Sequence, residues 1–168
     1  MIFAVDPSTV KVGWCVYDED RDEVVRYGVH RVTGDTFDEK LADIVRSIRY
    51  QFEVFDGDVL AVEMPVLHSR IRNVKTVIRL AQVVGVLRYA GLCWASRTVE
   101  VLPSERCLAF GLAANTKRNH AKRMLVSLVN ARFGLDLSPK EHDAADAIAV
   151  AVAADLKLRR EAVLDAAS

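Results

Sequence analysis

The sequence predicts a layered α/β domain in which helices flank a five-stranded mixed sheet. The first 32 residues hold three segments rich in β-branched and aromatic residues, joined by short turns, which is typical of a meander. Beyond them, helical and strand-like segments alternate along the chain. With 168 residues and 51% hydrophobic content, the chain is long enough for one full core, so residues 1–168 are expected to form a single domain.

Five short apolar segments, bounded by turn-forming residues, are predicted as strands. They are residues 2–6, 12–18, 23–32, 59–63 and 98–102. The first ends at the turn Pro7-Ser8, and the last is stopped by Pro103. Asp6 and Glu63 are therefore the final residues of two predicted strands, and in α/β sheets the carboxyl ends of parallel strands form the active-site edge.

Helical spacing of apolar residues predicts five helices around this sheet. They comprise residues 37–48, 74–90, 104–110, 121–129 and a final helix that opens at residues 138–141. Two of them carry start signals. Thr36 and Glu39 have the spacing of a capping box, and Ser138 is followed by a proline at the first helical position.

The helix at residues 74–90 is apolar on more than one side. One stripe contains Val74 and Ile78, and another contains Val83 and Leu87. A helix that is apolar on two sides packs on its own sheet and also on something else. The stripe with Val83 and Leu87 is expected to meet the second partner.

Charge is segregated along the chain although the net charge is zero. Residues 1–63 carry 7 Lys/Arg and 14 Asp/Glu, residues 64–132 carry 12 and 2, and residues 133–168 carry 4 and 7, which sums to 23 of each. The middle segment is thus at +10. A solvated basic face is one explanation, but a basic block between acidic ends favours a surface that binds a polyanion.

Composition also bears on location and redox state. No uninterrupted apolar run reaches the roughly 18 residues of a membrane span, and no secretory signal opens the chain, so a cytoplasmic protein without a membrane partner is expected. Cys15, Cys93 and Cys107 are odd in number and flanked by apolar residues. This pattern favours buried thiols over disulfides or a zinc site.

Four carboxylates are candidates for the chemistry. Asp6 and Glu63 end two strands, and Asp143 and Asp146 lie three residues apart, on one face of the alanine-rich final helix. Each has a simpler reading, because Asp6 could only form a turn, Glu63 could pair with Arg70, and the helix aspartates could be solvated. Together they predict a cluster that needs hard divalent cations, for which carboxylate oxygen is the preferred ligand.

Three segments carry a family resemblance. IFAVDPSTVKVGW, VLAVE and HDAADAIAVAVA resemble the RuvC family of Holliday junction resolvases, and the order of elements is similar over nearly the whole chain. The resemblance implies an RNase H-like fold and a homodimer that cuts four-way DNA junctions by two-metal hydrolysis with Mg²⁺ or Mn²⁺. It places the catalytic, metal-binding tetrad on Asp6, Glu63, Asp143 and Asp146.

The sequence departs from the family pattern at two places. Ser8 stands where family members usually have glycine, and the segment after Glu63 lacks the usual aromatic residue, leaving His68 as its one flat ring. The family's basic residues match best at Arg106 and Lys117. His142, beside the acidic motif, is either a proton carrier or metal ligand, or a surface histidine at a helix start.

The resulting hypothesis is a dimer, joined through the helix at 74–90, that holds DNA through its basic residues. The DNA-binding candidates are His68, Arg70, Arg72, Lys75, Arg79, Arg106, Lys117, Arg118, His120 and Lys122. Two alternatives stay open: an RNase H-fold nuclease acting on flaps, forks or RNA-containing duplexes, and a non-catalytic junction-binding protein. Accessory branch-migration proteins are further candidate partners, which the sequence does not identify.

Overall fold

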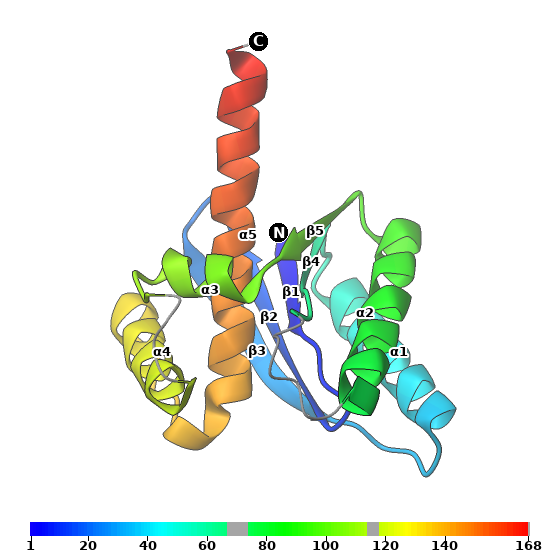
Figure 1. The fold of residues 1–168 in the computed structure, drawn as a ribbon. Helices are drawn as coiled ribbons and strands as arrows, with labels where there is room; N and C mark the ends of the chain where they lie inside the picture. Colours follow the sequence, from blue (N-terminus) through cyan, green and yellow to red (C-terminus); the bar gives the residue numbers. More distant parts are fainter. Residues whose placement is uncertain (67–73, 114–117, 168) are drawn as a thin grey trace.

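The computed structural model describes residues 1–66, 74–113 and 118–167, and within α4 the side chains of residues 118 and 119 are not described. The strands are β1 (Ile2–Asp6), β2 (Lys11–Asp18), β3 (Glu23–Arg31), β4 (Val59–Glu63) and β5 (Arg97–Val101). They form one sheet in the order β3-β2-β1-β4-β5 (Figure 1). The predicted five-stranded sheet is confirmed.

Strand directions make the sheet mixed, as predicted. β2 pairs antiparallel with both β1 and β3, which gives the expected meander. β1 pairs parallel with β4, from Ile2 opposite Val59 to Val5 opposite Val62, and β4 pairs parallel with β5. Because β1 and β4 run side by side in register, their carboxyl ends reach the same edge of the sheet.

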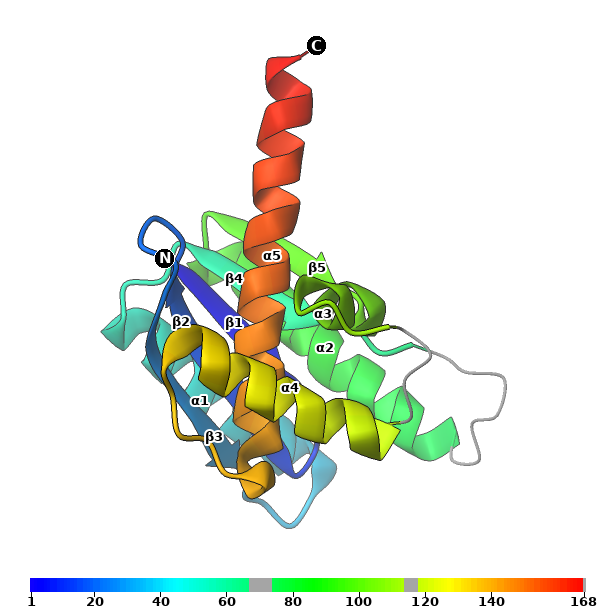
Figure 2. The ribbon, with the colours of Figure 1, turned by 90° about the vertical axis from the view of Figure 1, so that its left-hand side faces the viewer.

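The helices form a layer on each face of the sheet (Figures 1 and 2). Their bounds are α1 Phe37–Val54, α2 Val74–Trp94, α3 Pro103–Ala109, α4 Arg118–Phe133 and α5 His142–Ala166. α1 and α2 pack with Phe3, Val5 and Trp14 on one face. α3, α4 and α5 pack on the other, where Ile2 and Tyr17 point.

Local start signals explain where α1 and the 3₁₀ turn before α5 begin. The α1 capping box is present, since Thr36 Oγ1 accepts from the Glu39 backbone N–H at 3.2 Å and Glu39 Oε2 accepts from the Thr36 N–H at 3.0 Å. The final helix differs from the prediction. Ser138 and Glu141 cap a 3₁₀ turn over Pro139–Glu141, and α5 begins after it at His142.

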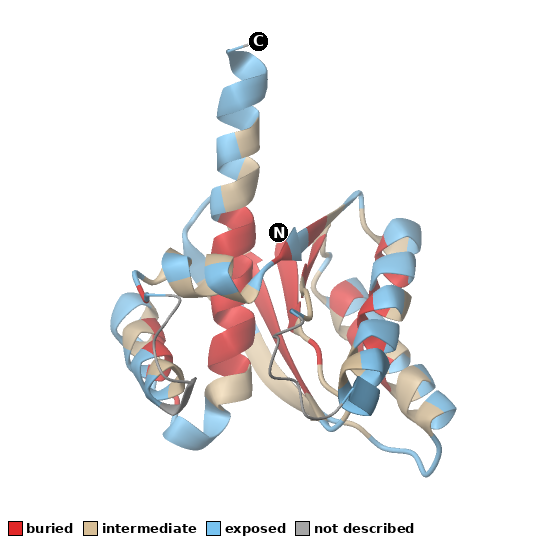
Figure 3. Ribbon diagram, viewed as in Figure 1, coloured by how far each residue is buried: buried red, intermediate tan, exposed pale blue. Residues whose placement is uncertain are grey.

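α5 is buried without interruption from Ala144 to Asp155 (Figure 3). Most of these residues are alanine or valine, and such small side chains let the helix lie close to the sheet. α3 and α4 cover its outer side (Figure 2). Beyond Asp155 the helix extends past the sheet, and its surface becomes mostly exposed.

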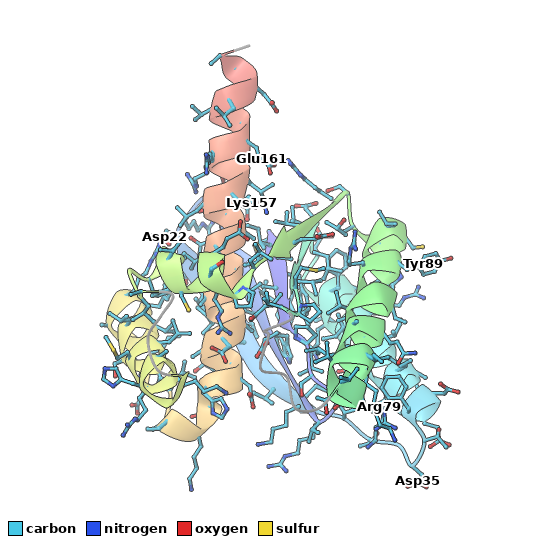
Figure 4. The ribbon with its side chains drawn as sticks, in the orientation of Figure 1. Asp22, Asp35, Arg79, Tyr89, Lys157 and Glu161 are labelled. Carbon is cyan, nitrogen blue, oxygen red and sulfur yellow. The ribbon has the colours of Figure 1, made fainter. Side chains whose placement is uncertain are left out.

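α2 corrects one sequence prediction. Val83 and Leu87, expected to meet a partner, are 1% and 0% exposed and belong to the chain's own core. The outward stripe instead contains Val74, Ile78, Tyr89 and Leu92, and Tyr89 points away from the sheet in Figure 4.

α2 also bears on the expected absence of a membrane span. Within the described ranges, it is the one helix long and apolar enough to cross a membrane by length and composition alone. The earlier expectation counted uninterrupted apolar runs, which charged residues such as Lys75 and Arg79 break. The cysteine prediction is also corrected in part, because Cys15 is buried but Cys93 on α2 is exposed and Cys107 is partly buried.

Candidate active site

The four predicted carboxylates line one cleft. Asp6 ends β1, Glu63 ends β4, and Asp143 and Asp146 lie in the first two turns of α5. All four face a cavity of about 630 Å³. Residues that are 140 positions apart in sequence thus meet because the parallel β1-β4 pair and the start of α5 share one edge of the sheet.

Gly13 brings α5 to this edge. It pairs with Asp6 across the β1-β2 ladder. A Cβ atom at Gly13 would lie 2.0 Å from the backbone oxygen of Asp143, which is closer than atoms can approach. The missing side chain therefore permits the contact between β2 and the first turn of α5, and this contact brings Asp143 close to Asp6.

Arg106 of α3 joins the cluster as its cation. Its Nη1 donates to Oε2 of Glu63 at 2.8 Å and lies 3.0 Å from Oδ1 of Asp146. The side chains of Arg106, Glu63 and Asp146 are 16%, 12% and 5% exposed. The pairing predicted as a simple alternative for Glu63 was with Arg70, which lies outside the described residues.

Burial and mutual repulsion set the protonation of the acids. Burial raises the pKa of Asp6 well above its ordinary value, and the charges of Glu63 and Asp146 raise it further. Burial raises the pKa of Glu63 to about 7, although the charge of Arg106 opposes this shift. Burial also raises the pKa of Asp146 against the opposing effect of Arg106. The cluster therefore holds its full negative charge only with cations beside it.

The donor set fits a divalent cation. Carboxylate oxygens are the ligands that Mg²⁺ and Mn²⁺ prefer, and four of them face one cleft. In the described part of the chain, no three His, Cys, Asp or Glu side chains are already close enough to enclose a metal ion. The Arg106 guanidinium lies between Glu63 and Asp146, where it supplies positive charge to the same oxygens.

The other predicted site residues fall in different places. Lys122 of α4 lines the cleft. Lys75 and His120 are exposed on α2 and α4. The Arg79 guanidinium lies 5.2 Å from the ring centre of Phe37, at the start of α1 (Figure 4). His68, Arg70, Arg72 and Lys117 lie outside the described residues, and only the backbone of Arg118 is described.

His142 contacts an acid of the cluster without lining the cleft. Its Nε2 lies 3.3 Å from Oδ1 of Asp143, and its side chain is 32% exposed. The imidazole is therefore partly solvated and close to one candidate ligand. This position is compatible with both interpretations that the sequence left open.

Sequence reasoning missed the apolar wall of the cleft. The chain just after β4 and the first turns of α2 both contribute to it. The apolar wall residues are Met64, Pro65, Val66, Val77 and Leu80, and Thr76 lies among them. A signal was present, because Val77 and Leu80 are apolar residues of the helix that the sequence predicted at 74–90.

The fold and the cleft define a class of protein, a nuclease of the RNase H-like fold. Residues 2–154 match the family model described as crossover junction endodeoxyribonuclease RuvC, and the chain belongs to that family. The predicted resemblance, the enzyme class and the function as a Holliday junction resolvase are thereby confirmed. The family is one of metal-dependent nucleases.

Individual relatives agree with this assignment. The crossover junction endodeoxyribonuclease RuvC of Dehalococcoides mccartyi is 26% identical over 154 residues, covering 90% of this chain and 88% of the relative. That of Pseudarthrobacter chlorophenolicus is 30% identical over 158 residues, covering 90% and 77%. Thermus thermophilus RuvC, solved in complex with a Holliday junction substrate, superposes with a TM-score of 0.77 at 17% identity, covering 95% and 94%.

Proposed function

We propose that Asp6, Glu63, Asp143 and Asp146 form the catalytic centre through which this chain resolves four-way DNA junctions. The observation that carries the proposal is the convergence of four acids, from two strands and a helix, on one cleft. When bound, two Mg²⁺ or Mn²⁺ ions supply the hydroxide and stabilise the leaving oxygen. The four carboxylates would hold these ions, and the partly apolar lining of the cleft would limit the water around the scissile phosphate.

Basic side chains would hold the DNA around this centre. Lys122 lines the cleft, and Lys75 and His120 are exposed on the helices beside it. We assign the same role to His68, Arg70, Arg72, Arg79, Arg106, Lys117 and Arg118, all of which belong to the +10 segment. Contacts to phosphates give affinity without sequence preference, which suits an enzyme that selects a DNA shape.

His142 would act as an auxiliary group. It lies 3.3 Å from Asp143 and is partly exposed, so it can exchange protons with water beside the cluster. In this role it would carry protons to and from the acids of the cluster. His142→Gln should then slow cleavage without abolishing it.

A homodimer through α2 would place two centres together. Resolution of a junction needs two symmetrical cuts, and a two-fold dimer relates its two sites by one axis. The exposed stripe of α2 offers an apolar patch for such a contact, with Val74 64%, Ile78 55%, Tyr89 70% and Leu92 75% exposed. At Gly85, a Cβ atom would have nothing within 4 Å, so another helix can approach the α2 backbone there.

Residues 1–168 would act as one domain, in the cytoplasm, where the chain meets DNA. Two clusters of buried side chains cover the two faces of the same continuous sheet, which supports one folding unit. The helix α2 packs Val83, Val84 and Leu87 on that sheet, which supports a role for α2 in the core of this domain and not in a membrane.

The substrate test separates the alternatives. The protein is incubated with a mobile four-way junction, a flap, a linear duplex and an RNA-containing duplex, with and without Mg²⁺ or Mn²⁺. Symmetrical paired cuts in the junction alone, dependent on metal, are expected. Preferential cleavage of the flap or the hybrid would favour the broader nuclease, and binding without cleavage in either metal would favour a junction-binding protein.

A further inference from the structure

Arg106 holds the carboxylate cluster through a single nitrogen atom. Nη1 lies 2.8 Å from Oε2 of Glu63 and 3.0 Å from Oδ1 of Asp146, so it bridges acids from β4 and α5. A structural arginine often meets one carboxylate through two parallel hydrogen bonds. Here the Nε atom is instead buried with no hydrogen-bond partner among the described residues. The contact resembles that of a compact cation between two anions.

A divalent ion and this guanidinium compete for the same oxygens. Mg²⁺ binds oxygen at about 2.0–2.1 Å and demands near-octahedral geometry. A nitrogen about 3 Å from both Glu63 and Asp146 occupies the space that such an ion needs between them. Two cations at one buried point also repel strongly. An ion that engages both acids must therefore displace Arg106.

The surroundings of Arg106 permit this displacement. α3 is a seven-residue helix with no fully buried residue, and its Cys107 and Ala109 pack against the core, so only the Arg106 side chain has to move. The Arg106 side chain lines the cleft together with Lys122. A guanidinium that leaves the acids stays at the cleft wall, where a phosphate of bound DNA is the available anion.

We propose that Arg106 is a placeholder cation. It positions Glu63 and Asp146 in the metal-free protein, yields them to the divalent ion, and then binds a phosphate of the junction. The inference rests on the proposed function, because it requires a metal ion in this cleft. The displacement of Arg106 makes metal binding and DNA binding cooperative, since both ligands bind the state in which Arg106 has left the acids.

Metal binding without DNA tests the first half of the exchange. R106M is titrated with MgCl₂ and MnCl₂ by calorimetry and is expected to bind roughly tenfold more tightly than wild type, because no cation has to be displaced. R88M is the matched control. Arg88 pairs with Glu100 at 2.6 Å on the surface, so its removal changes the net charge equally and should leave metal affinity unchanged.

R106Q is measured alongside R106M and carries the same expectation, so the test does not depend on one variant folding. Unchanged or weaker Mg²⁺ binding in the Arg106 variants would overturn the proposal. Absence of metal binding in every protein, wild type included, would instead remove the proposed metal centre. The two failures are therefore distinguishable.

Junction binding tests the second half. Affinity for the uncut junction is measured under two conditions, with Ca²⁺ and with EDTA. Ca²⁺ binds oxygen ligands with a more flexible geometry than Mg²⁺ does. R106M should weaken binding several-fold with Ca²⁺, where wild-type Arg106 is free to reach a phosphate, and have little effect in EDTA. Equal weakening in both conditions would show that Arg106 contacts DNA regardless of metal, which contradicts the exchange.

Discussion

The two long helices on opposite faces of the sheet differ in how they are covered. α5 is buried on every side over Ala144–Asp155, because small side chains fit it between the sheet and the helices α3 and α4. α2 buries Val83, Val84 and Leu87 but leaves a second apolar stripe exposed. The difference indicates separate tasks: α5 fixes acids rigidly at the cleft, and α2 keeps a surface available for a partner.

The largest expected effect lies on α5. Replacing Asp146 with asparagine removes a proposed metal ligand that is 4% exposed. Cleavage of a four-way junction should be abolished, because the site loses charge needed to hold its ions. Binding of the uncut junction should be retained or tightened, since one negative charge near the phosphates is gone. Gel assays of cleavage and binding provide both readouts, and near-normal cleavage would exclude Asp146 from the catalytic set.

A second change tests how rigidly α5 is placed. Gly13→Ala puts a Cβ atom 2.0 Å from the Asp143 carbonyl oxygen, so the helix must move away. We expect a loss of about 1–3 kcal/mol in the free energy of unfolding, together with a large drop in the rate of cleavage. Wild type is the reference for both measurements. Equal stability of Gly13→Ala and wild type would show that β2 does not position α5.

On α2, charged substitutions on the exposed stripe and on the buried stripe test which of the two meets a partner. Ile78→Glu is expected to give a folded monomer that nicks a supercoiled cruciform plasmid, because the exposed stripe no longer pairs with its copy. Leu87→Glu, in the core, should prevent stable folding. Sedimentation and circular dichroism measure the two outcomes.

Val163→Glu is a matched control for that test. Val163 is 69% exposed on the projecting end of α5, so its substitution adds the same charge away from the stripe. A dimer with unchanged paired cutting is expected. If Ile78→Glu also remained a dimer that linearises the plasmid, the interface would lie elsewhere.

The smallest expected effect is a pH dependence at the cleft. The folded-state pKa of Glu63 is raised to about 7 from an ordinary 4.5, so between these values the folded chain holds a proton that the unfolded chain has lost. The stability from this group is present below pH 4.5 and is lost as pH rises through 7.

Glu63→Gln lacks this titration. The free energy of unfolding of Glu63→Gln and of wild type is compared in EDTA. The value for Glu63→Gln minus that for wild type should increase by roughly 1–3 kcal/mol from pH 4.5 to pH 8, since one pKa unit corresponds to about 1.4 kcal/mol. Denaturant titrations at both pH values measure the difference. If this difference did not change with pH, Glu63 would be ionised in the folded protein over the whole pH range.

Local signals in the sequence predicted most of the fold. The capping box at Thr36 and Glu39 lies within four residues, and the strand endings at Asp6 and Glu63 follow from short apolar runs. Such features depend on near neighbours, so periodicity and turn chemistry reveal them.

Features that depend on tertiary contacts were not predicted in the same way. Periodicity identified two stripes on α2 but could not tell which one meets the sheet, so Val83 and Leu87 were assigned to the wrong side. Arg106 was expected to hold DNA, yet its contact with Glu63, 43 residues away, depends on how α3 packs. Nothing beside Gly13 in sequence signals that the Asp143 carbonyl lies opposite.

The most direct test of the central claim is the position of metal ions in the cleft. Anomalous diffraction from crystals of the protein soaked in MnCl₂ locates Mn²⁺ unambiguously. We predict peaks within about 2.5 Å of the carboxylate oxygens of Asp6, Glu63, Asp143 and Asp146, with Arg106 turned away from them. An enzyme that cleaves junctions with Mn²⁺ but binds its ions elsewhere, with Arg106 still on Glu63 and Asp146, would contradict it.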